Sequence, residues 1–189
     1  MTLTALEADH FFGYGSLVNR ATHAYAGGLA AHLTGWERVW VHTPARDLAF
    51  LSVRPASGVV IQGLVAQVPG RDWAALDARE FAYGRHPVTV DTESGPLSAQ
   101  VYAVPGSESA EPSDRHPILL SYLDAVVQGF ARESGPAGVA GFFSTTAGWK
   151  SPIMDDRRDP RYPRAQSLDK VTRAMVDDHL AAIDARILR

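Results

Sequence analysis

A chain of 189 residues, of which 46% are hydrophobic, is long enough for one domain with an extension and for one apolar core. Its net charge of −3 argues against nucleic acid as the main partner, and the lack of cysteine excludes disulfides, thiolate metal sites and a cysteine nucleophile. No apolar run approaches the roughly 20 residues of a membrane helix, so we expect no membrane partner.

Composition also bears on where the chain works. The first residues carry an acid, Glu7, and no basic cluster, so we expect no signal peptide. A chain without cysteine suits a reducing compartment, and we expect a cytoplasmic protein. Lysine occurs only at Lys150 and Lys170 among many arginines, a bias that favours a bacterial source.

Six short apolar or β-branched segments predict strands. They are residues 10–14, 33–42, 48–53, 59–68, 87–90 and 98–104. Gly35 is a candidate bulge in the second segment, and a turn around Ser94–Gly95–Pro96 joins the last two. Most of these segments follow one another without a helix between them. The pattern therefore favours hairpins that close into a small barrel over a doubly wound parallel sheet.

Three segments have the apolar spacing of amphipathic helices, at residues 71–81, 117–132 and 167–188. In the first, Trp73, Leu76 and Glu80 share a face. In the third, Ser167 is the candidate N-cap.

The sequence SGPAG at residues 134–138 predicts a break in the chain. We therefore expect a single domain over residues 1–189. Its core would cover about residues 10–133, and a C-terminal extension of loop and helix would cover about residues 134–189.

A turn of small residues follows the first predicted strand, in the sequence Tyr14–Gly15–Ser16–Leu17. Its backbone N–H groups at Gly15, Ser16 and Leu17 are open enough to hold an anion. A dinucleotide-binding fingerprint needs a third glycine where Val18 stands, and the Gly-x-Ser-x-Gly elbow of serine hydrolases is missing too. On the residues alone, the segment is also explained as an ordinary turn at the end of a strand.

Glu80 is the second candidate site residue. A glutamate near the end of a helix is usually solvated, which is the plain interpretation. Trp73 and Leu76 on the same face, together with the neighbouring Phe81, could exclude water from its carboxylate and raise the pKa of Glu80. A carboxylate with a raised pKa can act as a general base near neutral pH.

Two further features carry less information. The seven histidines are scattered, without an HExxH motif or a close pair, so we expect no metal site. Residues 148–164 contain three prolines and mixed charges, which predicts a loop. Its five basic residues and three acids form either a solvated, salt-bridged loop or a flap that offers an arginine to a substrate carboxylate, packed down by Trp149 and Tyr162.

The turn and the glutamate together resemble the motifs of the γ-glutamylcyclotransferase family, including its ChaC-like and AIG2-like branches. The family's Tyr-Gly-Ser-Leu type turn is matched by Tyr14–Gly15–Ser16–Leu17, and its Leu-Asp-x-x-Glu helix by Leu76–Asp77–Ala78–Arg79–Glu80. The strand Ile61–Gln62–Gly63–Leu64–Val65 and the segment from Tyr122 to Gly129 are similar to family segments as well. The resemblance covers roughly residues 10–130.

The sequence also departs from the family pattern. Phe81 stands where the ChaC-like branch has a glycine after the glutamate. Residues 148–164 extend beyond the simplest family members. Both departures leave the identity of the substrate open.

The resemblance implies a fold and a reaction. The fold is α+β, a small mixed β-barrel of about six strands with flanking helices. In the reaction, a γ-glutamyl amine, γ-glutamyl amino acid or glutathione-like peptide cyclises to 5-oxoproline and releases its amine, without metal or organic cofactor. The resemblance makes Glu80 the catalytic base. It assigns the glutamyl α-carboxylate to the N–H groups of Gly15, Ser16 and Leu17, and places Tyr14 in the pocket wall.

Two other functions stay open at this point. The same fold could serve as a non-catalytic module that binds small carboxylates or a partner protein. It could also host a related lyase-like or amide-transfer reaction with a different acyl donor. Product analysis separates these possibilities, because only cyclisation yields 5-oxoproline.

Overall fold

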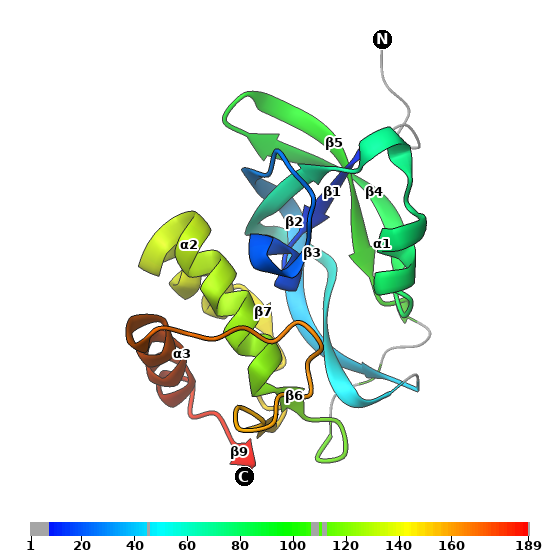
Figure 1. The fold of residues 1–189 in the computed structure, drawn as a ribbon. Coiled ribbons are helices and arrows are strands. Elements are labelled where there is room, and N and C mark those ends of the chain that lie inside the picture. Colours follow the sequence, from blue (N-terminus) through cyan, green and yellow to red (C-terminus); the bar gives the residue numbers. More distant parts are fainter. Residues whose placement is uncertain (1–7, 45, 107–109, 111–112, 189) are drawn as a thin grey trace.

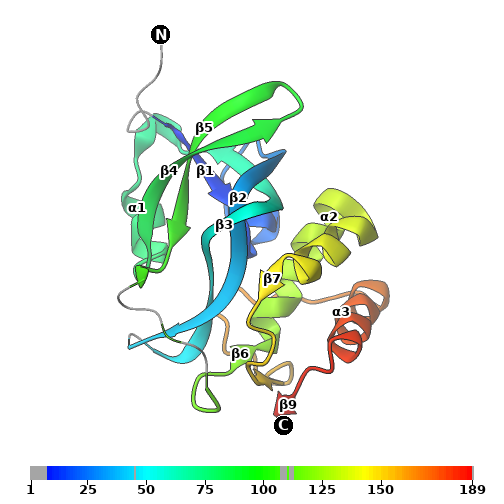
Figure 2. The ribbon, with the colours of Figure 1, turned by 180° about the vertical axis from the view of Figure 1, so that it is seen from behind.

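The computed structural model describes residues 8–44, 46–106, 110 and 113–188. Within this part, five strands close into a mixed barrel (Figures 1 and 2). They are β1 (His10–Gly13), β2 (Leu29–Thr43), β3 (Arg46–Gln67), β4 (Gly84–Thr92) and β5 (Gly95–Ala103). Their order is β3-β1-β5-β4-β2, and β2 pairs again with β3 to complete the ring. The expected small mixed barrel with flanking helices is confirmed.

The short strand β1 lies between two partners. It pairs antiparallel with β3, where Phe12 faces Val65, and parallel with β5, where Phe12 faces Val101. Phe11 and Phe12 point to opposite faces of the sheet, and both are buried. Packing on both faces therefore fixes the point at which residues 14–17 leave the barrel.

β2 and β3 form one long hairpin, although the sequence predicted three separate strands in this region. β3 runs without interruption through both of its predicted parts. Between Thr34 and Trp36 the register with β3 shifts, which is the bulge expected at Gly35, where φ is 83°. Ser57 and Gly58, which are typical turn residues, lie opposite this bulge, and Gly58 has a φ of 78°. The prediction of two separate strands was wrong because the chain pairs with β2 on both sides of the bulge, at Pro55 and at Val60.

Three α-helices of the described residues flank the barrel: α1 (Ala74–Arg79), α2 (Leu120–Ser144) and α3 (Lys170–Ala182). α1 lies on one side of the barrel and α2 and α3 on the other (Figures 1 and 2). α1 is shorter than predicted and ends before Glu80. No helix in the described ranges is long and apolar enough to cross a membrane.

The ends of α3 also differ from the prediction. Its N-cap is Asp169 rather than Ser167, because the Asp169 carboxylate accepts the Thr172 backbone N–H at 2.7 Å. At the other end, residues 187–188 form a strand, β9 (Ile187–Leu188), and not the last turn of a helix.

α2 passes through the break predicted at residues 134–138. Gly135 leaves the helical region with φ of 62°, and helix resumes from Pro136 onward. Proline fits there because the first turn of a helix leaves its N–H groups without partners. The glycine and proline thus interrupt α2 locally without ending it.

Small strands tie the C-terminal part together. β6 (Ile118–Leu119), β8 (Ile153–Met154) and β9 form a parallel sheet, while β7 (Thr146–Ala147) adds to the edge of β2. β8 lies inside residues 148–164, so this segment is less irregular than the predicted loop.

The core lies between the barrel and the buried face of α2. A close approach at Gly129 lets α2 reach the chain after β1, since a Cβ there would lie 2.7 Å from the Asn19 backbone nitrogen. Asn19 donates from its side chain to the Ala125 carbonyl at 2.8 Å and to Gln128 Oε1 at 2.9 Å. α2 therefore holds the segment that follows residues 14–17.

Candidate active site

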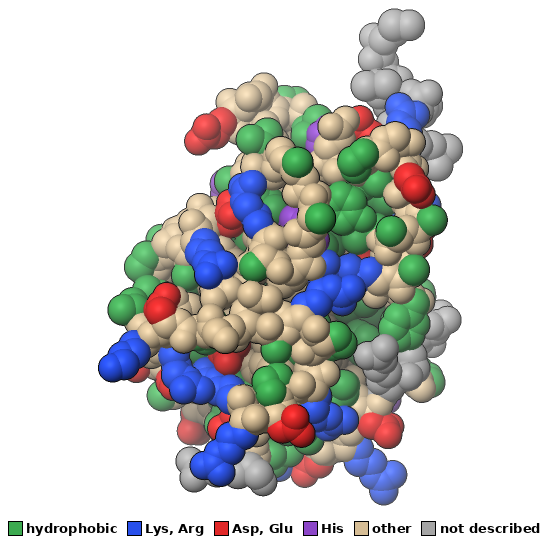
Figure 3. Space-filling view, in the orientation of Figure 1, with side chains coloured by type: hydrophobic (Ala, Val, Ile, Leu, Met, Phe, Trp, Pro, Cys, Tyr) green, Lys and Arg blue, Asp and Glu red, His purple; other side chains and the backbone are tan. Residues whose placement is uncertain are grey.

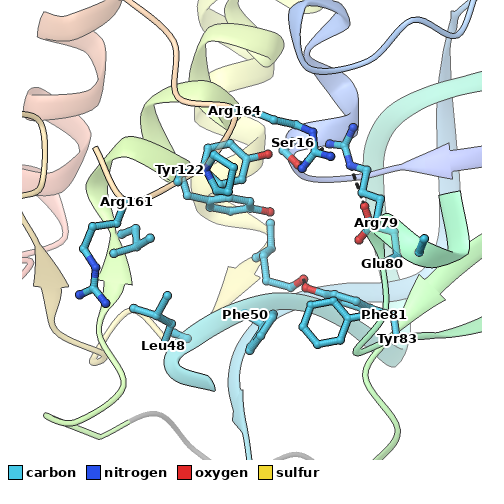
Figure 4. A pocket seen from close by; sticks show the side chains of 16 residues that line it. Ser16, Leu48, Phe50, Arg79, Glu80, Phe81, Tyr83, Tyr122, Arg161 and Arg164 are labelled. Atoms are coloured by element: carbon cyan, nitrogen blue, oxygen red, sulfur yellow. Dashed lines mark hydrogen bonds and ion pairs between the residues drawn. The ribbon is translucent and has the colours of Figure 1, made fainter. Parts of the chain in front are cut away.

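A cavity of about 390 Å³ opens between the barrel and α2 (Figure 4). Its walls come from the turn after β1, the start of β3, the end of α1, the start of α2 and the segment after β8. A smaller hollow of about 30 Å³ adjoins it at the turn. Tyr14, Gly15, Ser16, Leu17 and Glu80 all line this smaller hollow. The structure thus brings together all five residues that the sequence analysis selected.

Glu80 follows the last residue of α1 and caps that helix with its backbone. Its N–H donates to the Leu76 carbonyl at 2.9 Å, and its carboxylate lies 3.0 Å from Arg79 Nε. The Glu80 side chain is only 16% exposed. Burial raises the pKa of Glu80, and the positive charges of Arg79 and Arg164 oppose this rise in part.

The residues that enclose Glu80 are not those that the helix pattern predicted. Trp73 and Leu76 pack in a separate apolar cluster, and Phe81 is 55% exposed at the cavity mouth. Leu51, Tyr83 and Tyr122 line both hollows together with Glu80. The shared-face argument was wrong because α1 contains only residues 74–79, so Trp73 and Glu80 lie at its two ends and not within one longer helix.

The turn after β1 begins a short 3₁₀ helix, Ser16–Val18. The first bond of that helix runs from the Val18 N–H to the Gly15 carbonyl at 3.0 Å, so the N–H groups before Val18 have no partner within the helix. The Ser16 N–H interacts with the Tyr122 hydroxyl and favours its ionised form, although burial raises the pKa of Tyr122 overall. One of the N–H groups that the turn could offer to an anion, that of Ser16, therefore already interacts with the Tyr122 hydroxyl.

Position 15 requires glycine because the Tyr122 side chain lies directly against the backbone there. A Cβ at Gly15 would lie 2.7 Å from Tyr122 Oη and 3.1 Å from Leu51 Cδ2. Real Cβ atoms do not approach a phenol oxygen that closely. The glycine therefore allows the tyrosine to lie directly against the turn.

Tyr14 forms part of the wall of the smaller hollow. Its hydroxyl donates to the Tyr102 carbonyl at 2.6 Å, and burial raises the pKa of Tyr14 well above its usual range. The Tyr14 carbonyl accepts from Nε of Arg38 at 2.8 Å, and Arg38 is fully buried. Because the Tyr14 hydroxyl is neutral and already hydrogen-bonded, Tyr14 is better suited to form the wall of the hollow than to transfer a proton.

Arg79 links the two motifs, and the sequence analysis did not select it. In addition to its ion pair with Glu80, it donates to Ser16 Oγ at 3.1 Å and to the Thr22 carbonyl at 2.8 Å. The only signal in the sequence was its place beside Glu80. An Arg-Glu neighbour pair on a helix usually lies in solvent, and Ser16 is 63 residues away along the chain.

The sequence left two interpretations of the segment after β8, a salt-bridged loop and a flap that offers an arginine to a substrate, and different residues fit each of them. Arg157 is salt-bridged to Asp124 and Asp177, each at 2.7 Å. Arg161 and Arg164 instead line the cavity.

The two aromatic residues expected to hold that segment behave differently. Tyr162 packs edge-on against Tyr122 with ring centres 5.1 Å apart. Trp149 stacks on Phe143 at 4.9 Å and donates to the Phe143 carbonyl. It therefore belongs to the core and does not cover the cavity.

Metal binding finds no support in the described residues. Nowhere in the described ranges do three His, Cys, Asp or Glu side chains gather as a metal site would require. The chemistry available in the cavity is that of one carboxylate, backbone N–H groups, tyrosine hydroxyls and arginines.

Sequence comparison identifies one family. Residues 11–122, more than half of the chain, match the model of the family described as gamma-glutamyl cyclotransferase, AIG2-like. A search of curated proteins finds no match.

Solved structures share the fold. A gamma-glutamyl cyclotransferase is 15% identical, with a TM-score of 0.58, over 91% of this chain and 99% of that chain. The uncharacterised protein LOC79017 from Homo sapiens is 16% identical, with a TM-score of 0.58, over 90% of this chain and 99% of that chain. YkqA from Bacillus subtilis is 18% identical, with a TM-score of 0.59, over 71% of this chain and 52% of that chain. At these identities the likeness shows the fold.

Proposed function

Because the chain belongs to the gamma-glutamyl cyclotransferase, AIG2-like family, we propose that it cyclises γ-glutamyl compounds to 5-oxoproline and releases their amine. The substrates would be γ-glutamyl amines, γ-glutamyl amino acids or glutathione-like peptides. The observation that carries this proposal is the place of Glu80. Its enclosed carboxylate, with a raised pKa, shares one hollow with the turn at residues 15–17. Cyclisation needs such a base beside a group that fixes the substrate.

Substrate binding would begin at the turn. The backbone N–H groups of Gly15, Ser16 and Leu17 would hold the glutamyl α-carboxylate, and Tyr14 would form part of the wall. The α-nitrogen is attached to the same carbon atom as this carboxylate. Fixing the carboxylate therefore places the α-nitrogen close to Glu80 and within reach of its own γ-carbonyl.

The reaction needs no water and no enzyme nucleophile. Glu80 takes a proton from the α-ammonium, and the free amine attacks the γ-carbonyl carbon to form the ring C–N bond. The bond from that carbon to the departing nitrogen then breaks. The α-nitrogen loses two protons on its way from ammonium to lactam, and the departing nitrogen gains two on its way from amide to ammonium. Glu80 relays them, so that protons balance without an external acid or base.

The direct test measures 5-oxoproline released from a panel of glutathione, γ-glutamyl-alanine and γ-glutamyl-ε-lysine. We expect 5-oxoproline and the free amine in equal amounts from at least one donor. The preferred donor defines the amine half of the substrate. Release of glutamate without 5-oxoproline would contradict cyclisation and indicate hydrolysis, whereas a new γ-glutamyl amide would indicate amide transfer.

Glu80→Gln is the matched control, because the amide keeps the shape of the side chain and cannot take a proton. We expect the rate of 5-oxoproline release to fall by about 10²- to 10⁴-fold, the usual contribution of a general base. Circular dichroism and the melting curve would show that the variant is folded. A variant that retained the wild-type rate would remove Glu80 from the mechanism.

The non-catalytic module is the second candidate function. It would require that the wild-type protein binds a small carboxylate and converts none of the donors. The enclosed base argues against it, since a pure binding site for carboxylates gains nothing from a buried carboxylate.

A further inference from the structure

Arg164 lines the large cavity at the end where Ser16 and Glu80 lie. Figure 4 shows its side chain next to Ser16 and Arg79, whereas Arg161 lies toward the other end of the cavity. The Arg164 charge reaches Glu80, because it is one of the two cations that oppose the rise of the Glu80 pKa. On the face drawn in Figure 3, basic side chains lie near the middle, bordered by hydrophobic ones.

Arg161 and Arg164 line the cavity, and neither guanidinium forms an ion pair with a carboxylate of the described residues. Of the two, Arg164 is the one whose side chain lies beside Ser16 and Arg79. Arg79 is committed to Glu80, Ser16 and Thr22. Arg157, in the same segment as Arg164, is committed to two aspartates. Among the described residues, Arg164 forms no ion pair with any carboxylate.

The backbone that carries Arg164 is anchored to α2. The Asp156 carboxylate accepts the Ser121 N–H at 2.8 Å and the Arg161 N–H at 2.9 Å. The Tyr162 ring packs on Tyr122, and the Ala165 N–H donates to the Tyr162 carbonyl at 3.0 Å. Arg164 therefore extends from a fixed turn.

The α-carboxylate of a bound substrate would be the second carboxylate in this cavity, and it needs a cation other than Arg79, which is paired with Glu80. A bound glutamyl α-carboxylate would lie close to the Glu80 carboxylate, and like charges in an enclosed site repel strongly. The turn offers only neutral N–H donors, and the Ser16 N–H is shared with Tyr122. A guanidinium provides both the missing charge and paired donors that match a carboxylate.

We propose that Arg164 determines the specificity of the cavity for γ-glutamyl compounds with a free α-carboxylate, because its guanidinium binds that carboxylate beside the turn at residues 15–17. The proposal rests on the proposed function. Arg164 lies outside the part of the chain that matches the family, since the match ends at residue 122. The proposal therefore adds a charged substrate contact from the C-terminal part of the chain.

The test combines a change in the enzyme with a change in the substrate. Arg164→Gln is compared with wild type on the best donor of the panel and on the same donor with its α-carboxylate replaced by a carboxamide. On the carboxylate donor we expect KM to rise about 10- to 100-fold in the variant, with a smaller change in kcat. On the carboxamide donor, the variant and wild type should be nearly equal. Equal losses on both donors, or no loss on either, would overturn the proposal.

Two control variants separate this effect from a general loss of charge. Arg158→Gln removes the same charge from an exposed position in the same segment that does not line the cavity, and it should leave KM unchanged. Arg164→Lys keeps the charge and should restore part of the affinity. A KM change of equal size in Arg158→Gln would contradict direct binding by Arg164.

The pH profile gives a readout that a purely structural role would not move. Removing Arg164 removes a charge that lowers the Glu80 pKa, so the acid limb of kcat/KM should move to higher pH in Arg164→Gln. Arg79 is the other cation that acts on Glu80. Among the described residues, the other titratable groups on which the Glu80 charge acts are tyrosines whose pKa values are all raised, so they stay neutral in this range. They are Tyr14, Tyr25, Tyr83, Tyr102 and Tyr122.

Binding of 5-oxoproline tests the inference without turnover, because this product keeps the α-carboxylate. Calorimetry should show an affinity at least about tenfold lower in Arg164→Gln than in wild type. If no donor is converted but this difference is found, the proposed function fails and the carboxylate site stands. If donors are converted and the variant binds 5-oxoproline as well as wild type, the carboxylate site fails and the proposed function stands. Absence of both turnover and 5-oxoproline binding in wild type would overturn both.

Discussion

At the scale of single residues, the sequence offered Glu80 and the turn as candidates but did not reveal their surroundings. Short motifs identified both, and the structure places them in one hollow. The side chains that enclose Glu80 come from distant parts of the chain, such as Leu51 in β3 and Tyr122 in α2. The sequence analysis did not select Arg79, because its partner Ser16 becomes a neighbour only in the folded chain.

The raised pKa of Glu80 has a consequence for stability. A carboxyl group whose pKa is higher in the folded than in the unfolded state stabilises the fold at low pH. This stabilisation is lost as the pH rises through the folded-state pKa, because the buried group must then ionise. We therefore expect Glu80→Gln to melt at a higher temperature than wild type at about pH 8, and the difference to shrink toward about pH 4.

Thermal melts of the two proteins over this pH range check the expectation. Glu37→Gln is a suitable control, because Glu37 forms an exposed ion pair with Arg54 on β2 and β3. A Glu80→Gln protein that is less stable than wild type at alkaline pH would show that the ion pair with Arg79 outweighs the cost of burial.

At the scale of elements, local patterns identified the strands and helices but failed where distant pairing decides. β3 continues through a typical turn sequence because β2 accommodates the extra residues opposite Gly35. β8 is only two residues long and exists because β6 and β9 pair with it. Neither partnership leaves a trace in the spacing of residues along the chain.

Asp156 is the anchor of the segment that carries Arg161 and Arg164. The two carboxylate oxygens of Asp156 accept the backbone N–H groups of Ser121 and Arg161. Asp156→Asn replaces one of these oxygens by an N–H₂ group, which cannot accept a hydrogen bond, so one of the two backbone donors loses its partner. We expect a loss of about 1–3 kcal/mol in the free energy of unfolding, together with a higher KM for the preferred donor.

Denaturant unfolding and steady-state kinetics of Asp156→Asn measure the two effects. Asp159→Asn is the matched control, because its side chain is exposed in the same segment. Wild-type stability and KM in Asp156→Asn would mean that the segment is held by other contacts.

At the scale of the whole molecule, the barrel decides where the site forms. The run of strands without helices favoured hairpins that close into a small barrel, and the family resemblance implied the same fold. The parallel pairing of β1 with β5 joins residues 11–12 to residues 100–101, a contact that no local pattern could reveal. This pairing inserts β1 into the ring and directs the turn at residues 14–17 toward α2.

Gly63 tests how tightly the barrel packs beside β1. A Cβ at Gly63 would lie 2.3 Å from the Gly13 carbonyl oxygen and 2.6 Å from the Phe12 ring. We expect Gly63→Ala to lower the free energy of unfolding by about 1–3 kcal/mol through overpacking, and to reduce activity because β1 carries the turn.

Gly141→Ala provides the comparison, since a Cβ there would meet no atom within 4 Å and alanine favours the helix. It should be neutral or stabilising by up to about 1 kcal/mol. If both variants behaved alike in denaturant unfolding, the close approach at Gly63 would not limit the barrel.

The central claim is that Glu80 acts as the base of a cyclisation. The rate of 5-oxoproline formation by wild type and Glu80→Gln, measured side by side across pH with the preferred donor, tests it most directly. We expect the wild-type rate to rise with pH through the raised pKa of Glu80, because the base must be ionised, and the variant to remain near background at every pH. A folded Glu80→Gln protein that forms 5-oxoproline at the wild-type rate, with the same pH profile, would contradict the account.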